Sequence, residues 1–122
     1  MTTKMPSKIR GAVAERKTFA PIFAALGDET RLELVTKLCD GSSRSISELT
    51  TGTELTRQAV TKHLRVLEVA ELVQSVRSGR ENLFELAPAK FDDMQAYLAF
   101  VAEAWAENTN GALARLKTFV ES

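Results

Sequence analysis

The chain has 122 residues, a formal net charge of zero, 44% hydrophobic residues and 26% charged residues, which are ordinary values for a single globular domain. It contains no apolar run as long as the ~18 residues of a membrane span and no apolar N-terminal segment typical of a secretory signal. A single cysteine excludes an internal disulfide. We therefore expect a cytoplasmic protein that does not enter a membrane.

The zero net charge hides an uneven distribution. Residues 1–17 hold five basic residues and one acidic residue, and residues 56–80 hold five basic and two acidic residues. The balance reverses in residues 88–122, which hold three basic and five acidic residues. A local basic excess is what a nucleic-acid surface needs, so residues 56–80 are the candidate. Residues 1–16 show no clear hydrophobic period, and we expect a flexible basic arm there.

Two amphipathic helices are predicted in the first third of the chain. Hydrophobic residues spaced i, i+3, i+4 and i+7 from Phe19 predict a helix over residues 18–26, which Gly27 ends. Asp28 is placed to cap a second helix, and Gly41 is placed to end it. The apolar face of this second helix is expected to comprise Leu32, Val35 and Cys39, with Leu34 and Leu38 beside them. Cys39 would then be a small core residue.

A short third helix and a longer fourth helix follow. Ser45 and Glu48 have the spacing of a capping box, and Gly52 lies in a polar break after it. Thr56 is placed to cap the fourth helix, which is expected to end near residue 71. Two helices joined by a Gly-containing turn are typical of a helix-turn-helix, whose second helix enters the major groove of DNA.

The predicted fourth helix has two distinct faces. Val60, Leu64 and Leu67 recur at i, i+4 and i+7 and are expected to face the core. The other face carries Arg57, Gln58, Thr61, Lys62 and Arg65. Arginine and glutamine side chains can hydrogen-bond to base edges, and lysine side chains to phosphate. Taken alone, this helix fits an ordinary core helix with a solvated polar face equally well. The elements predicted before and after it favour DNA binding.

A β-hairpin is predicted directly after this helix. Residues 72–77 and 82–86 alternate in the manner of strands, and residues 78–80 have turn chemistry. A hairpin that follows a recognition helix is a wing, and Arg77 and Arg80 would lie at its tip, where a minor groove or a phosphate is met. The alternative is a structural hairpin with solvated arginines.

The last section is predicted to be helical and to bind a partner helix. Pro88 is suited to the first position of a helix, and an apolar stripe follows at three- and four-residue steps. A polar interruption at residues 107–111 separates this stripe from a second one, which contains Leu113, Leu116 and Phe119. So long an apolar helix exceeds the need of a small core, so a symmetric dimer is expected.

These residues carry a family resemblance. Asp28-x-x-Arg31-Leu32, the stretch from Leu55 to Leu67, Leu72-Val73 and Ser78-Gly79-Arg80 resemble the ArsR family of dimeric winged-helix repressors from bacteria and archaea. The resemblance covers roughly residues 18–122. It implies a homodimer that binds an imperfect palindrome near its own promoter and leaves it in response to a signal.

The expected fold is mainly α with a small β-hairpin wing, a winged helix-turn-helix in the order α-α-α-α-β-β-α. The expected parts are a basic arm (1–16), a DNA-binding core (17–87) and a C-terminal dimerisation section (88–122). The expected DNA contacts are Thr56, Arg57, Gln58, Thr61, Lys62, His63, Arg65, Arg77 and Arg80. Because the resemblance implies that the first and last helices form the dimer interface, the expected interface residues are Phe19, Ile22, Phe23, Tyr97, Phe100, Val101, Trp105, Leu113, Leu116 and Phe119.

The chain departs from the metal-sensing members that it resembles. Those members place cysteines in the third helix, or Asp, His and Glu ligands on the last helix. Residues 46–52 contain no Cys, and residues 88–122 contain neither His nor Cys. A tight zinc or arsenic site needs three or four nitrogen or sulfur ligands, so we expect no metal and no cofactor. In this respect the chain resembles a subset of the family whose signal is unknown or is a small organic molecule.

Three hypotheses of function follow. The first is a homodimeric repressor that binds double-stranded DNA with sequence specificity. The second is a winged-helix module that binds another protein through its last helix and has little affinity for DNA. The third is a metal- or redox-switched sensor that uses Cys39, and an intersubunit Cys39 pair belongs to this hypothesis. An enzyme is the least expected class, because no nucleophile–base pair, phosphate loop or paired-carboxylate site is present.

Overall fold

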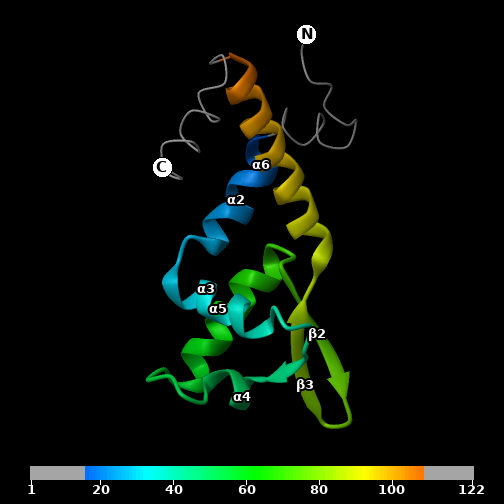
Figure 1. The fold of residues 1–122 in the computed structure, drawn as a ribbon. Helices are drawn as coiled ribbons and strands as arrows, with labels where there is room; N and C mark the ends of the chain where they lie inside the picture. The colour runs from blue at the N-terminus through cyan, green and yellow to red at the C-terminus, as the bar shows by residue number, and fades with distance from the viewer. Residues whose placement is uncertain (1–15, 109–122) are drawn as a thin grey trace, which may run out of the picture.

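The computed structural model describes residues 16–108, in which five helices and a small sheet follow the order α-α-β-α-α-β-β-α. The elements are α2 (Arg16–Leu26), α3 (Glu29–Leu38), β1 (Arg44–Ser45), α4 (Ile46–Thr50), α5 (Arg57–Val69), β2 (Val73–Ser78), β3 (Glu81–Leu86) and α6 (Pro88–Asn108). The strands form an antiparallel sheet in the order β1-β3-β2. In Figure 1, α2 and α6 lie together at one end of the molecule and the β2–β3 hairpin lies at the other.

The helix starts confirm the predicted caps. The Asp28 carboxylate accepts a hydrogen bond from the Arg31 backbone N–H at 3.0 Å, which caps α3. Ser45 and Glu48 form a complete capping box at the start of α4. The Thr56 hydroxyl accepts from the Ala59 N–H at 3.0 Å and caps α5. Each side chain satisfies an N–H that the first turn of a helix leaves without a partner.

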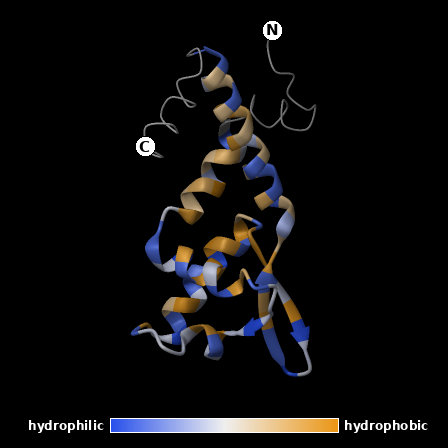
Figure 2. Ribbon diagram, in the orientation of Figure 1, coloured by the Kyte–Doolittle hydropathy of each residue, from blue (hydrophilic) through white to orange (hydrophobic). Residues whose placement is uncertain are grey.

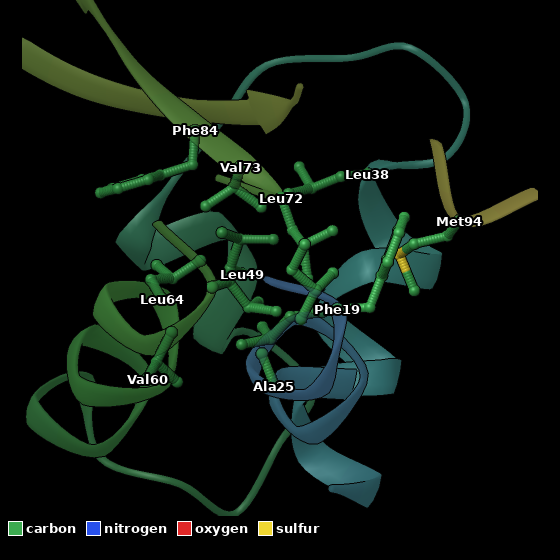
Figure 3. Close-up of a cluster of buried hydrophobic side chains, with 13 residues drawn as sticks. Phe19, Ala25, Leu38, Leu49, Val60, Leu64, Leu72, Val73, Phe84 and Met94 are labelled. Carbon is green, nitrogen blue, oxygen red and sulfur yellow. The ribbon is translucent and has the colours of Figure 1, made fainter. Parts of the chain in front are cut away.

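One hydrophobic core joins all the helices to the sheet (Figure 3). Val60, Leu64 and Leu67 of α5 are completely buried, as the spacing predicted. The rest of the core comes from every other helix, from both strands of the hairpin and from Leu72 just before β2: Phe19, Ile22, Ala25, Leu34, Leu38, Leu49, Leu72, Val73, Phe84 and Met94. The core therefore fixes α5 in place from one side only and leaves its opposite face free.

The predicted apolar face of α3 is wrong at Leu32 and Cys39, whereas Val35 packs against the core as predicted. Leu34 and Leu38 are its buried residues, whereas Leu32 is 49% exposed and Cys39 is exposed at the end of the helix. Leu34 and Leu38 are four residues apart and stack on one side of α3. That side contacts α5 and β3, so it holds the core. Cys39 is therefore a surface thiol and not a core residue.

The predicted fold class is confirmed, and β1 is the element that it lacked. Arg44 pairs with Phe84, and Ser45 pairs with Leu83. A two-residue polar strand has no hydrophobic period, so no local pattern in the sequence reveals it.

Two helix bounds differ from the prediction. Helix α2 begins at Arg16, and α5 ends at Val69. The end of α5 comes earlier than predicted because Glu71 has a φ of 62°, which is incompatible with a right-handed helix. The second apolar stripe expected after residue 111 lies outside the described residues.

The polar loop before β1 gives a test at low pH. Hydrogen bonds from the Ser42 hydroxyl and N–H, and then from Arg44, lower the pKa of Asp40 to about 2 from an ordinary 3.8. A carboxylate with a lowered pKa in the folded chain stabilises the fold above its unfolded value, and this stabilisation is lost as the pH falls. The free energy of unfolding of the wild type should therefore fall more steeply than that of Asp40→Asn between pH 3.8 and about 2. Urea unfolding at several pH values measures this, and parallel curves would contradict it.

Candidate nucleic-acid interface

The exposed face of α5 gathers the residues that were predicted to bind DNA. Arg57, Gln58, Lys62 and Arg65 are exposed, and Thr61 is half-buried. They lie opposite the buried Val60, Leu64 and Leu67, so the core holds the helix while the polar face meets solvent. Helix α4 packs against α5, and the turn between them passes through Gly52, whose φ of +83° favours glycine. The pair therefore forms the helix-turn-helix that the sequence predicted.

Two hydroxyls on this face have partners within the helix. Thr56 accepts from Ala59 as the cap, and the Thr61 hydroxyl donates to the Arg57 carbonyl at 2.8 Å. Because the Thr61 hydroxyl donates its proton within the helix, its oxygen can still accept a hydrogen bond from another group. Thr56 consequently fixes the start of α5, while Arg57, Gln58 and Lys62 present their long side chains at its N-terminal half.

The His63 side chain is positioned by contacts with Arg31 and Asp28 of the same chain. Its Nδ1 lies 3.2 Å from Nη1 of Arg31 and 3.8 Å from Oδ2 of Asp28. Because a guanidinium can only donate, Nδ1 of neutral His63 accepts and the ring proton lies on Nε2. Arg31 is itself fixed by a 2.6 Å hydrogen bond from its Nε to the Ala25 carbonyl. The predicted contact of His63 with a DNA phosphate would therefore use Nε2 as the hydrogen-bond donor, and it stays a prediction.

The sequence did not reveal that Asp28 and Arg31 contact His63. The hydrogen bond from the Arg31 backbone N–H first, and then the charge of the Arg31 guanidinium, lower the pKa of Asp28. Asp28 therefore stays ionised beside Arg31 and His63. The signal in the sequence was the Asp28-x-x-Arg31 spacing, but His63 lies 32 positions after Arg31, so no local pattern reveals their contact.

The wing is the β2–β3 hairpin, whose turn has two residues, Gly79 and Arg80, and whose tip is polar. Gly79 has a φ of +61°, and Arg77 Nε donates to the Gly79 carbonyl at 3.3 Å. Arg77 and Arg80 are both exposed, and Figure 2 shows the outer half of the hairpin as hydrophilic. At the base, the Glu85 carboxylate accepts from Ser43 and Gln74, each at 2.7 Å, and these bonds lower the pKa of Glu85. The bond from Ser43 joins the wing to the loop before β1, and the Ser75 hydroxyl of β2 donates to the Glu68 carboxylate of α5 at 3.2 Å.

The residues predicted for the dimer interface fall into two groups. Phe19 and Ile22 are each only 5% exposed, and Phe19 stacks on Tyr97 of α6 with ring centroids 5.0 Å apart. These contacts join α2 to α6 within one chain. Phe23, Tyr97 and Phe100 are half-buried, and Val101 and Trp105 are 44% and 50% exposed. The other predicted residues, Leu113, Leu116 and Phe119, lie outside the described residues.

Within residues 16–108 no three His, Cys, Asp or Glu residues lie together in a way that could hold a metal ion. In the same range no helix is long and apolar enough to cross a membrane.

The family model for "Bacterial regulatory protein, arsR family" matches residues 28–75. The HTH-type transcriptional regulator YuzN of Bacillus subtilis is 43% identical over 65 residues, which span 48% of this chain and 71% of YuzN. The arsenical resistance operon repressor of the same bacterium is 31% identical over 64 residues, which span 52% of this chain and 61% of the repressor.

Solved structures share the fold. An ArsR-like transcriptional regulator from Rhodococcus sp. RHA1 has a TM-score of 0.72 and 35% identity, with 89% of this chain and 95% of that chain covered. The homodimeric winged helix-turn-helix domain of Mb0332 from Mycobacterium bovis has a TM-score of 0.59 and 22% identity, with 84% and 90% covered. The second likeness, at its lower identity, concerns the fold alone.

Proposed function

The chain belongs to the ArsR family of DNA-binding transcriptional regulators, and from this premise we propose that it is a homodimeric repressor that a signal releases from a palindromic operator. One observation carries the proposal: α5 is fixed by three completely buried residues and exposes Arg57, Gln58 and Lys62 beside a wing with two exposed arginines. The arsenical resistance operon repressor, one of its relatives, supports the repressor role.

We assign the DNA contacts as follows. Arg57, Gln58 and Thr61 contact base edges in the major groove, where forked and amide side chains distinguish base pairs. Lys62, Arg65 and Nε2 of His63 contact phosphates, and Thr56 keeps the first turn of α5 in shape for them. Arg77 and Arg80 contact the backbone or the minor groove from the wing.

We assign residues 17–87 to DNA binding and residues 88–122 to dimerisation, with residues 1–16 as a basic arm. Leu98, Val101 and Trp105 are 54%, 44% and 50% exposed, and they continue the line of the buried Met94 along α6. Hydrophobic residues continue along α2 and α6 towards the end of the molecule opposite the β2–β3 hairpin (Figure 2). A second copy that covers this line would place two winged units on one palindrome. The protein acts in the cytoplasm, where it meets DNA, and the proposal gives it no catalytic role.

DNA binding measured by fluorescence anisotropy tests the proposal. The full chain is titrated onto the fragment upstream of its own gene and onto a random duplex, at two salt concentrations. We expect a preference of at least a hundredfold for the upstream fragment and a steep fall in affinity with salt. Weak and equal binding to both duplexes would favour the second hypothesis, a module that uses the exposed line on α6 for another protein.

Gln58 gives a test of base recognition. Gln58→Ala should weaken binding to the preferred fragment by about 1–3 kcal/mol, because an amide that pairs with adenine discriminates by that amount. Binding to the random duplex should stay unchanged, since such binding depends on phosphate contacts. Gln95→Ala, the same change at an exposed position on α6, is the matched control. An equal loss on both duplexes would remove Gln58 from the base-reading set.

Arg80 gives a test of backbone contact by the wing. Arg80→Ala should weaken binding to every duplex by a similar factor and lower the slope of log affinity against log salt by about 1. Lys90→Ala, which removes a positive charge at the start of α6, should leave the slope unchanged. A slope that Arg80→Ala does not alter would exclude Arg80 from the contacts.

A further inference from the structure

A pocket of about 520 Å³ lies between α2 and the last two turns of α5. Its walls are small and apolar and include Ala24 and Ala25 of α2 and Val66 and Val69 of α5. Val66 and Val69 are 41% and 84% exposed, so the apolar wall is open to solvent. The volume is within the range of small-molecule sites, which is about 300–1,000 Å³.

The charged residues that line this pocket are both arginines. Arg31 is held in one orientation by the Ala25 carbonyl at 2.6 Å and by Nδ1 of His63 at 3.2 Å. Arg65 is exposed, and no hydrogen bond or ion pair joins it to another residue of the described part of the chain. An apolar wall with one fixed and one free guanidinium matches a molecule that has an apolar body and an anionic head. Guanidinium groups bind carboxylates with paired, charge-assisted hydrogen bonds.

We propose that this pocket binds a small organic carboxylic acid and that the bound acid weakens DNA binding. The aliphatic or aromatic body would lie against Ala24, Val66 and Val69, and the carboxylate would pair with Arg31 and Arg65. The regulatory half of this proposal rests on the proposed function, because it assigns the signal that releases the repressor.

The pocket is connected to the DNA-binding helix by two routes. Arg31 donates to His63, and a carboxylate that takes this guanidinium competes with that hydrogen bond. Val66 and Val69 belong to α5 itself, while Ala24 belongs to α2, which stacks on α6 through Phe19 and Tyr97. A ligand bound between α2 and α5 would therefore change the angle between α5 and the two proposed dimer helices, α2 and α6. A ligand shifts such an equilibrium by its difference in affinity for the two arrangements.

An NMR titration of the full chain without DNA tests the site. The probes are 4-phenylbutyrate and its neutral analogue 4-phenylbutanol. We expect shifts at the amides of Ala24, Val66 and Val69 and at least tenfold tighter binding of the acid. Equal affinity for acid and alcohol, or shifts confined to Leu98, Val101 and Trp105 on α6, would overturn the proposal.

A charge-removal pair tests the anionic head. Arg65→Gln should weaken binding of the acid at least tenfold and leave binding of the alcohol unchanged. Lys17→Gln, which removes a positive charge from an exposed position on α2 outside the pocket lining, is the matched control and should change neither. Loss of acid binding in both variants would indicate a general charge effect and would count against the site.

The regulatory half is tested on the wild type, with affinity for the upstream fragment measured with and without saturating 4-phenylbutyrate. We expect at least a tenfold loss of affinity with the acid and no loss with the alcohol at the same concentration. An unchanged or higher affinity would overturn the regulatory half. If the ligand-free chain shows no preference for the upstream fragment, the proposed function fails, and the NMR titration still decides the site.

Discussion

Leu64→Ala is expected to lower the free energy of unfolding by about 2–5 kcal/mol, the range found when a buried leucine is truncated. Leu64 has no exposed surface and lies in the core between α5 and the other helices (Figure 3). The substitution removes apolar contacts and leaves a cavity that the surrounding side chains fill only in part. It also removes a contact that holds the DNA-binding helix, so both stability and DNA affinity should fall.

Urea unfolding followed by circular dichroism measures this change. Val69→Ala is the matched control on the same helix, because Val69 is 84% exposed and its truncation should alter the free energy by no more than about 0.5 kcal/mol. A urea unfolding curve of Leu64→Ala close to that of the wild type would show that the buried face of α5 is assigned wrongly.

The elements that the sequence predicted well are those whose signals lie within a few residues of one another. The i, i+4 and i+7 spacing of Val60, Leu64 and Leu67 identified the buried face of α5, because one helix fixes the direction of all three side chains. The cap at Thr56 involves groups three residues apart, and the hairpin ends meet across a two-residue turn. Local geometry decides these features, and they position most of the candidate site.

The features that the sequence did not reveal depend on distant contacts. Leu32 and Cys39 fit an apolar stripe on α3 as well as Leu34 and Leu38 do, and only the packing of α5 and β3 decides which side is buried. The bond between Arg31 and His63 likewise joins α3 to α5 across 32 residues. For the same reason the pocket between α2 and α5 has no signature in the chain, since its small residues become walls only when two helices meet.

Val101→Glu is expected to convert the dimer to a monomer and to lower affinity for the upstream fragment at least a hundredfold. Val101 is 44% exposed in the single chain, so folding of the protomer should tolerate the change. In a symmetric dimer the same position occurs twice near the axis, and two carboxylates would lose water and repel each other there. A monomer binds one half-site at a time, and a hundredfold loss equals about 2.7 kcal/mol.

Sedimentation equilibrium and anisotropy on the same samples measure these two effects. Ala99→Glu is the matched control, because it adds the same charge to an exposed position of α6, two residues away and off the line of Met94, Leu98, Val101 and Trp105. A dimeric Val101→Glu with unchanged affinity would separate α6 from dimerisation. A monomeric Val101→Glu that keeps full affinity would show that one winged unit suffices for recognition. A loss of affinity that accompanies dissociation, with Ala99→Glu unaffected, ties recognition to two copies of the helix and wing on one operator.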